Sequence, residues 1–236
     1  MAAVDVYLEV GKSRTLAGAI NWPGWCRSGR DADAALQTLF EYAPRYGRVL
    51  SHARLNFTPP SDLAALRVVE RVPGASGADF GVPEVAPSAD SQPVSESDLE
   101  RFTKLLRACW RSFDGTVDAA RGKPLRKGAR GGGRDLDAIV SHVLDGDGGY
   151  LWRLASQKRG DITGLDRPAQ LEFTRKALLD ALTASAHGQV PLVGPRGGKR
   201  WTARYAVRRV AWHVLDHAWE IEDRCLSASL PAATNP

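Results

Sequence analysis

Hydrophobic and polar positions follow two different periods along this chain. Up to about residue 75 the apolar residues mostly alternate with polar ones, which predicts half-buried strands at residues 4–10, 14–21, 25–29 and 66–72. One stretch with helical spacing lies between the third strand and the fourth, and Asp31 is placed to cap its N-terminus. This order of elements predicts a small α+β unit.

From about residue 97 onward the apolar period is helical. The predicted helices cover residues 97–117, 136–155, 167–186 and 202–226. Ser95 or Ser97 can cap the first helix, and Pro168 suits the first turn of the third. Four helices of similar length that are joined by loops predict an up-and-down four-helix bundle.

A segment with few large apolar residues separates the two regions. Residues 73–96 are rich in Pro, Gly, Ser and Ala, which is typical of a linker or a wrapping arm. We therefore predict a two-domain α+β protein. Its parts are an α+β domain at 1–75, a linker or wrapping arm at 76–96, a four-helix domain at 97–228 and a flexible tail at 229–236.

The composition is that of an ordinary globular protein. Of the 236 residues, 43% are hydrophobic and 25% are charged, which is enough to build a sizeable core. No apolar run approaches the roughly 20 residues of a membrane-spanning helix, and the N-terminus has no signal-peptide pattern. Cys26, Cys109 and Cys225 are isolated from one another, so they form neither a disulfide framework nor a Cys-x-x-Cys metal site. We expect a cytoplasmic protein with reduced thiols and no membrane partner.

The net charge of +5 raises the question of nucleic acid. Acidic and basic residues are interleaved through most of the chain, so no long stripe of one sign forms. The exception is the glycine-rich segment 121–134, RGKPLRKGARGGGR, which contains no acidic residue. This segment is either a solvated loop or an anion-binding loop, and in the second interpretation Arg126 and Arg130 bind a cofactor. Because no aromatic residues are interleaved with these basic ones, we do not expect nucleic acid as a partner.

Three of the five histidines fall where they could bind a metal. His213 and His217 are four residues apart, so on a helix they lie on one face, one turn apart. His142 shares a helix face with Gly146 and Gly149, which leave room beside an imidazole. Three neutral imidazoles from two helices would leave coordination positions open on a divalent metal, as catalytic sites do. The same spacing also occurs in ordinary polar-face histidines, so spacing alone leaves metal binding open.

Glu220 is the candidate catalytic residue near the histidine pair. It could orient a metal ligand or act as a base, and a surface salt bridge to Arg224 is the alternative. Asp216 and Asp223 form a second acidic row on the same predicted helix. We expect these two carboxylates to be solvated or paired with Arg208 and Arg209.

Two segments resemble a known family. Residues 206–224, AVRRVAWHVLDHAWEIEDR, resemble the last helix of DinB-like (YfiT-like) metalloproteins, and residues 137–142, DAIVSH, resemble the helix that carries that family's first histidine. The resemblance implies a four-helix bundle that binds zinc or nickel through His142, His213 and His217. Family members include mycothiol-dependent maleylpyruvate isomerase and bacillithiol transferases. It therefore implies mycothiol or a similar low-molecular-weight thiol as cofactor, and a small electrophile or thiol as substrate.

The N-terminal unit resembles a HicB-like antitoxin domain, in its opening strand at residues 6–9, its Pro23-Gly24 turn and its helix from Asp31. Several kinds of function stay open at this stage. The first is a metal-dependent transferase, isomerase or hydrolase. The second is a metal-binding or stress-response module without catalysis, in which the N-terminal domain mediates association, for example as a homodimer. Nucleic-acid binding is the third.

Overall fold

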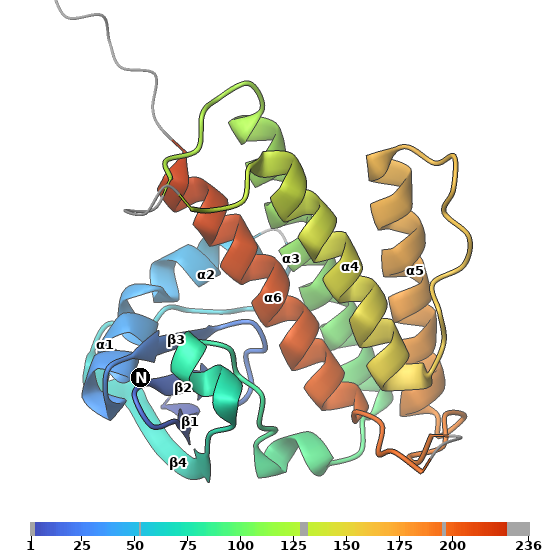
Figure 1. The fold of residues 1–236 in the computed structure, drawn as a ribbon. Coiled ribbons are helices and arrows are strands. Elements are labelled where there is room, and N and C mark those ends of the chain that lie inside the picture. The colour runs from blue at the N-terminus through green and yellow to red at the C-terminus, as the bar shows by residue number, and fades with distance from the viewer. Residues whose placement is uncertain (1–2, 52, 128–131, 195–196, 226–236) are drawn as a thin grey trace, which may run out of the picture.

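The computed structural model of this chain describes residues 3–51, 53–127, 132–194 and 197–225. Over these residues it contains an N-terminal four-stranded sheet with helices, followed by further helices, with six α-helices in all (Figure 1). The predicted α+β fold class is therefore confirmed. The predicted tail at residues 229–236 lies outside the described residues. None of the described helices is both long and apolar enough to cross a bilayer.

The strands lie in the order β3-β2-β1-β4 across the sheet. They are β1 (Val4–Val10), β2 (Thr15–Ala19), β3 (Cys26–Gly29) and β4 (Leu66–Pro73). β2 pairs antiparallel with both β1 and β3, whereas β4 runs parallel to β1. Because parallel neighbours need a crossover connection, β4 can reach this edge only after the chain has passed through the helices that follow β3.

Two short helices form the crossover. α1 (Ala32–Glu41) begins at Asp31, whose side chain accepts a hydrogen bond from a backbone N–H of the first turn, as predicted. α2 (Ala43–Leu50) follows immediately and is not predicted by the sequence pattern. Its Tyr46 is fully buried and stacks on Trp25, with the ring centroids 5.8 Å apart. The stacked rings fix this helix against the sheet, and the four strands together with α1 and α2 are called the sheet unit below.

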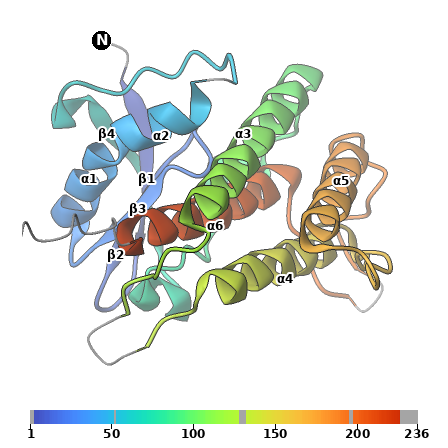
Figure 2. The same ribbon diagram turned by 90° about the horizontal axis from the view of Figure 1, so that it is seen from above.

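The second half of the chain consists of four helices that match the predicted ones to within a few residues. They are α3 (Glu96–Ala120), α4 (Leu136–Ala155), α5 (Arg167–Ala186) and α6 (Ala203–Arg224). Each begins at a residue whose side chain accepts a hydrogen bond from the first turn, and Ser95 rather than Ser97 caps α3. α6 lies between the sheet unit and the other helices, whereas α5 is on the far side (Figures 1 and 2). A groove of about 1460 Å³ lies between α3, α4 and α5.

α6 carries the packing between the two halves of the chain. One continuous cluster of buried hydrophobic residues extends from Val6 and Trp25 in the sheet unit to Val214 and Ile221 on α6. Only a few residues of α6 are exposed, because the helix is covered on one side by the sheet unit and on the other by α3 and α4. Polar residues on this helix are therefore buried as well, and each needs a partner.

Arg208 of α6 has such a partner. Its Nε and Nη2 each donate to the Asp90 carboxylate at 2.7 Å, and its Nη1 donates to the backbone oxygen of Ala19 at 2.9 Å. Asp90 belongs to the segment that the sequence analysis describes as a linker or wrapping arm. The side chains of Arg208 and Asp90 are only 5% and 3% exposed, so this ion pair is inside the protein. It connects α6, the arm and the sheet.

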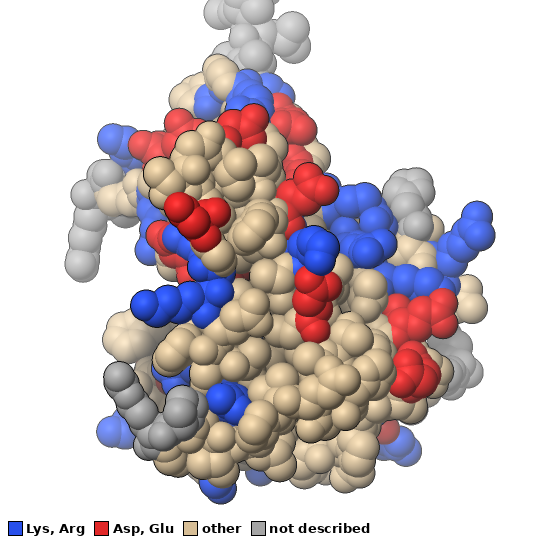
Figure 3. Space-filling view, turned by 90° about the vertical axis from the view of Figure 1, so that its right-hand side faces the viewer, with Lys and Arg blue, Asp and Glu red and all other residues tan. Residues whose placement is uncertain are grey.

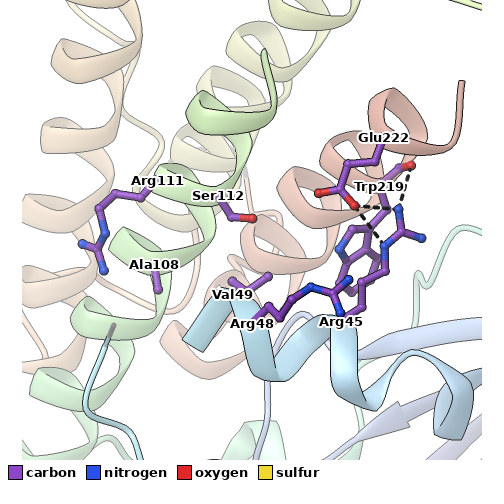
Figure 4. Close-up of a pocket in the computed structure, with 8 residues that line it drawn as sticks. All are labelled: Arg45, Arg48, Val49, Ala108, Arg111, Ser112, Trp219 and Glu222. Atoms are coloured by element: carbon purple, nitrogen blue, oxygen red, sulfur yellow. Dashed lines mark hydrogen bonds and ion pairs between the residues drawn. The ribbon is translucent and has the colours of Figure 1, made fainter. Parts of the chain in front are cut away.

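Arg45 of α2 makes a second polar connection to α6. Its Nη2 donates to Glu222 and to Asp223, at 2.7 Å each, beside a hollow of about 260 Å³ between α2, α3 and α6 (Figure 4). Asp216 in turn pairs with Arg27 of β3. The predicted pairing of Asp216 and Asp223 with the arginines at 208 and 209 is therefore wrong, because both carboxylates bind arginines of the sheet unit instead.

Charges on the α5 side of the molecule are mixed. On the face drawn in Figure 3, Lys and Arg side chains are interspersed with Asp and Glu side chains. No continuous basic stripe is visible among the described residues of this face. The distribution follows the interleaving of acidic and basic residues along the sequence.

Candidate metal centre

The three histidines predicted as metal ligands lie together in the folded chain. His142 is on α4, and His213 and His217 are one turn apart on α6. Their potential ligand atoms all lie within 4.8 Å of one another, and the Nε2 atoms of His142 and His213 are 3.2 Å apart. Over the described part of the chain, no second group of three potential metal-binding side chains occurs. The convergence comes from the crossing of α4 and α6.

Burial separates these histidines from ordinary surface histidines. His213 and His217 are 6% and 8% exposed, and His142 is half-buried. Burial and the neighbouring charges of His217 and His142 lower the pKa of His213 to about 2. Burial and the charges of His217 and Arg134 also lower the pKa of His142. Both imidazoles are therefore neutral at physiological pH, which is the form that binds metals.

Gly146 on α4 provides the space that His213 occupies. A Cβ atom at position 146 would lie 2.9 Å from Nδ1 of His213 and closer still to its Cε1. At Gly149, by contrast, a Cβ atom would meet nothing within 4 Å. Of the two glycines predicted to make room for an imidazole, only Gly146 does so, and it does so for His213 rather than for a residue of its own helix.

Glu220 connects His217 to Arg224. One carboxylate oxygen lies 2.8 Å from Nδ1 of His217, and the other accepts a hydrogen bond from Nη1 of Arg224. These hydrogen bonds, that of His217 first, lower the pKa of Glu220, so the carboxylate is ionised and acts as an acceptor. The orienting contact and the salt bridge, which the sequence presents as alternatives, occur together. Because an ionised carboxylate only accepts hydrogen bonds, Nδ1 of His217 is the donor in this contact, and Nε2 is the atom of the neutral ring that could bind a metal.

The donor set and its spacing fit a divalent transition metal. With metal–nitrogen bonds of about 2.0–2.1 Å, two ligands of a tetrahedral ion lie roughly 3.3 Å apart. The 3.2 Å between the Nε2 atoms of His142 and His213 is close to that separation. In addition, Nδ1 of His213 is buried without a hydrogen-bond partner, so His142 is the only hydrogen-bond partner of this ring among the described residues. Imidazole ligands suit zinc and nickel.

Part of the basic segment that precedes α4 contacts the C-terminal end of α6. The backbone N–H of Arg126 donates to the oxygen of Arg224 at 2.7 Å, and its Nη2 donates to the oxygen of Asp223 at 3.0 Å. Its guanidinium therefore holds the C-terminal end of α6. Arg130, the second predicted cofactor-binding residue, lies outside the described residues. Arg134 is the loop residue whose charge acts on the histidines.

A cluster of residues next to His213 was not predicted as part of the site. The ring of Tyr150 meets the ring of His213 edge-on, with centroids 5.4 Å apart. The guanidinium of Arg209 lies 5.7 Å from the centroid of Tyr150 and 5.1 Å from that of Trp212. Arg209 precedes His213 by four residues, so the spacing that identifies the histidine pair also places Arg209 on the same face.

Lowering the pH is expected to destabilise the metal-free protein. Because the pKa of His213 lies below its unfolded value of about 6.5, the unfolded chain binds protons that the folded chain does not. Stability should be constant above about pH 6.5 and should fall by up to about 1.4 kcal/mol per pH unit below it. Urea unfolding in chelator between about pH 7 and pH 5 measures this, with a loss of about 2 kcal/mol expected from His213. The His213→Gln variant should lose that share, and an equally steep dependence in the variant would contradict the assignment.

Comparison of the chain with protein-family models, with curated proteins and with solved structures gives no match. The DinB-like and HicB-like resemblances therefore stay predictions. The support for a metal centre comes from the geometry of the three histidines and their neighbours.

Proposed function

We propose that this protein is a metal-dependent transferase or isomerase of the DinB-like class, which uses a low-molecular-weight thiol such as mycothiol. In this proposal His142, His213 and His217 hold a zinc or nickel ion, and α3 to α6 form the four-helix bundle of that class. The observation that carries it is the convergence of three imidazoles from two helices, with the Nε2 atoms of His142 and His213 3.2 Å apart. The substrate would be a small electrophile.

The chemistry that the metal could supply follows from its being held by three protein ligands. A divalent ion held by three protein ligands keeps a position free and supplies Lewis acidity, which lowers the pKa of a thiol or water bound there. The chain's own residues position that centre. Glu220 keeps Nδ1 of His217 protonated and its ring fixed, and Arg224 in turn holds the second oxygen of Glu220. Gly146 permits the approach of His213 to α4.

Metal analysis of tag-free protein tests the ligand set. We expect about one divalent ion per chain in the unchanged protein and a large loss in each of the variants His142→Ala, His213→Ala and His217→Ala. His187→Ala is a matched control, because His187 lies at the end of α5, where its Nε2 lies 2.8 Å from Glu96. Metal content that is substoichiometric and equal in all variants would overturn the proposal.

A second measurement separates the enzyme from a metal-binding module without catalysis. The metal-loaded protein is incubated with a small thiol and an electrophile, and the conjugate is quantified. We expect conjugate above the level that free metal produces, and its loss in His213→Ala. A protein that binds one metal but forms no conjugate would instead support the module.

A further inference from the structure

We infer that Arg209 forms an anion subsite beside the histidine cluster, which binds a carboxylate group of the thiol or electrophile used at that centre. The inference rests on the proposed function and names the substrate class of the same site. It depends on four observations about the guanidinium group: its burial, its missing partner, its aromatic surroundings and its place next to His213.

Arg209 is buried with only part of the hydrogen bonding that a buried guanidinium needs. The residue is 7% exposed, and its Nε and Nη1 atoms are buried with no hydrogen-bond partner. Its neighbour Arg208, which is equally buried, has a carboxylate and backbone oxygens around it. A buried charge without a counter-charge is costly, so a site that keeps one usually supplies its partner by other means. A bound anion is such a means.

Glu9 is the carboxylate whose charge interacts with Arg209, and it is already bound to other groups. Both oxygens of Glu9 accept hydrogen bonds from backbone N–H groups of the wrapping arm, at 3.1–3.2 Å. Asp90 is bound to Arg208, and Asp216 to Arg27. None of these side chains pairs with Arg209. Glu9 therefore offsets the charge of Arg209 at a distance, and the N–H groups at Nε and Nη1 are left for an external carboxylate.

Aromatic side chains hold the guanidinium in place, and the Tyr150 hydroxyl interacts with it, but Nε and Nη1 of Arg209 still have no hydrogen-bond partner. Tyr150, Trp201 and Trp212 surround it, with centroids 5.7, 5.8 and 5.1 Å from its central carbon. Cation–π contacts of this kind stabilise the charge through the ring faces. The donors of a guanidinium lie in its plane and form a fork that matches the two oxygens of a carboxylate. The rings therefore fix the orientation of the guanidinium, whose Nε and Nη1 atoms still lack a hydrogen-bond acceptor.

The position of Arg209 puts this donor beside the proposed metal centre. It lies one helical turn before His213 on α6, and Tyr150 of α4 contacts both residues. The charge of Arg209 is also one of the influences that lower the pKa of His213. A ligand whose sulfur or oxygen atom lies at the histidine cluster would therefore reach Arg209 with a carboxylate a few bonds away.

Thiol binding to the Co²⁺-loaded protein tests the subsite by a spectroscopic readout. The probes are 3-mercaptopropionate and 3-mercapto-1-propanol, which have the same length and differ in the carboxylate. Binding is followed by the sulfur-to-cobalt absorption band. We expect the unchanged protein to bind the carboxylate probe about tenfold more tightly or better, the ratio that one charge-assisted hydrogen bond supports. Arg209→Met should remove this preference without weakening the neutral thiol, and Arg209→Lys should retain part of it.

Arg153→Met is the matched control. Arg153 is exposed and lies 6.0 Å from the same Trp201 ring, so its loss changes the aromatic packing but not the buried charge. We expect it to keep the full preference. An unchanged protein that binds both thiols equally, or a preference that survives in both Arg209 variants, would overturn the inference while the metal site stands. Failure of Co²⁺ to bind at all would overturn the metal proposal, and the inference with it.

Discussion

Replacing Gly146 by alanine is expected to abolish metal binding at the histidine cluster. The added Cβ atom would lie 2.9 Å from Nδ1 of His213 and closer to Cε1, in a region where neither α4 nor the buried ring of His213 has free space. The ring would have to move by about 1 Å, whereas metal–ligand bond lengths tolerate only about 0.2 Å. We expect the metal affinity to fall by at least about 100-fold, measured by competition with a chromophoric chelator.

Gly149→Ala is the control for this prediction. The substitution is chemically the same, it lies on the same helix, and a Cβ atom there meets nothing within 4 Å. Its metal affinity should be unchanged and its stability slightly higher, because alanine favours a helix over glycine by up to about 1 kcal/mol. Equal metal binding by the two variants would mean that α4 and α6 separate easily, and the close approach of Gly146 to His213 would not define the site.

Most of the elements that could be predicted are marked by residues that lie close together in the sequence. Asp31, Ser95 and Thr202 cap helices through hydrogen bonds to residues within three positions, so their neighbours in the sequence suffice to identify them. The parallel pairing of β4 with β1 joins residues about 60 positions apart, and no local pattern specifies it. α2 went unpredicted for a similar reason, because its apolar face is defined by contacts with the sheet unit.

The difference between local signals and contacts of distant residues also applies to the candidate metal centre. His213 and His217 are recognisable because four-residue spacing fixes their common face, and a glycine near His142 indicates space. Which imidazole uses that space could not be predicted, since it depends on how α4 crosses α6. That Arg209 forms no ion pair among the described residues could not be predicted for a related reason. Asp216 and Asp223 lie close to it in sequence, but their partners, Arg27 and Arg45, come from the sheet unit.

Breaking the buried ion pair between Arg208 and Asp90 is expected to cost more stability than any surface substitution in this chain. In Asp90→Leu the guanidinium of Arg208 stays buried but loses its counter-charge and two hydrogen bonds of 2.7 Å. Removing one partner of such a pair typically costs about 3–5 kcal/mol. Urea unfolding followed by circular dichroism should show a lower midpoint with an unchanged slope.

The double variant Arg208→Met with Asp90→Leu decides whether the loss comes from the unpaired charge. Without a buried charge, much of the lost stability should return, because hydrophobic replacements of a buried pair are often nearly neutral. Lys176→Met is the surface comparison: Lys176 pairs with Asp180 at 2.6 Å, but the two side chains are 75% and 64% exposed, so its loss should cost about 1 kcal/mol or less. A double variant as unstable as Asp90→Leu would instead assign the loss to the contacts that join the wrapping arm, the sheet and α6.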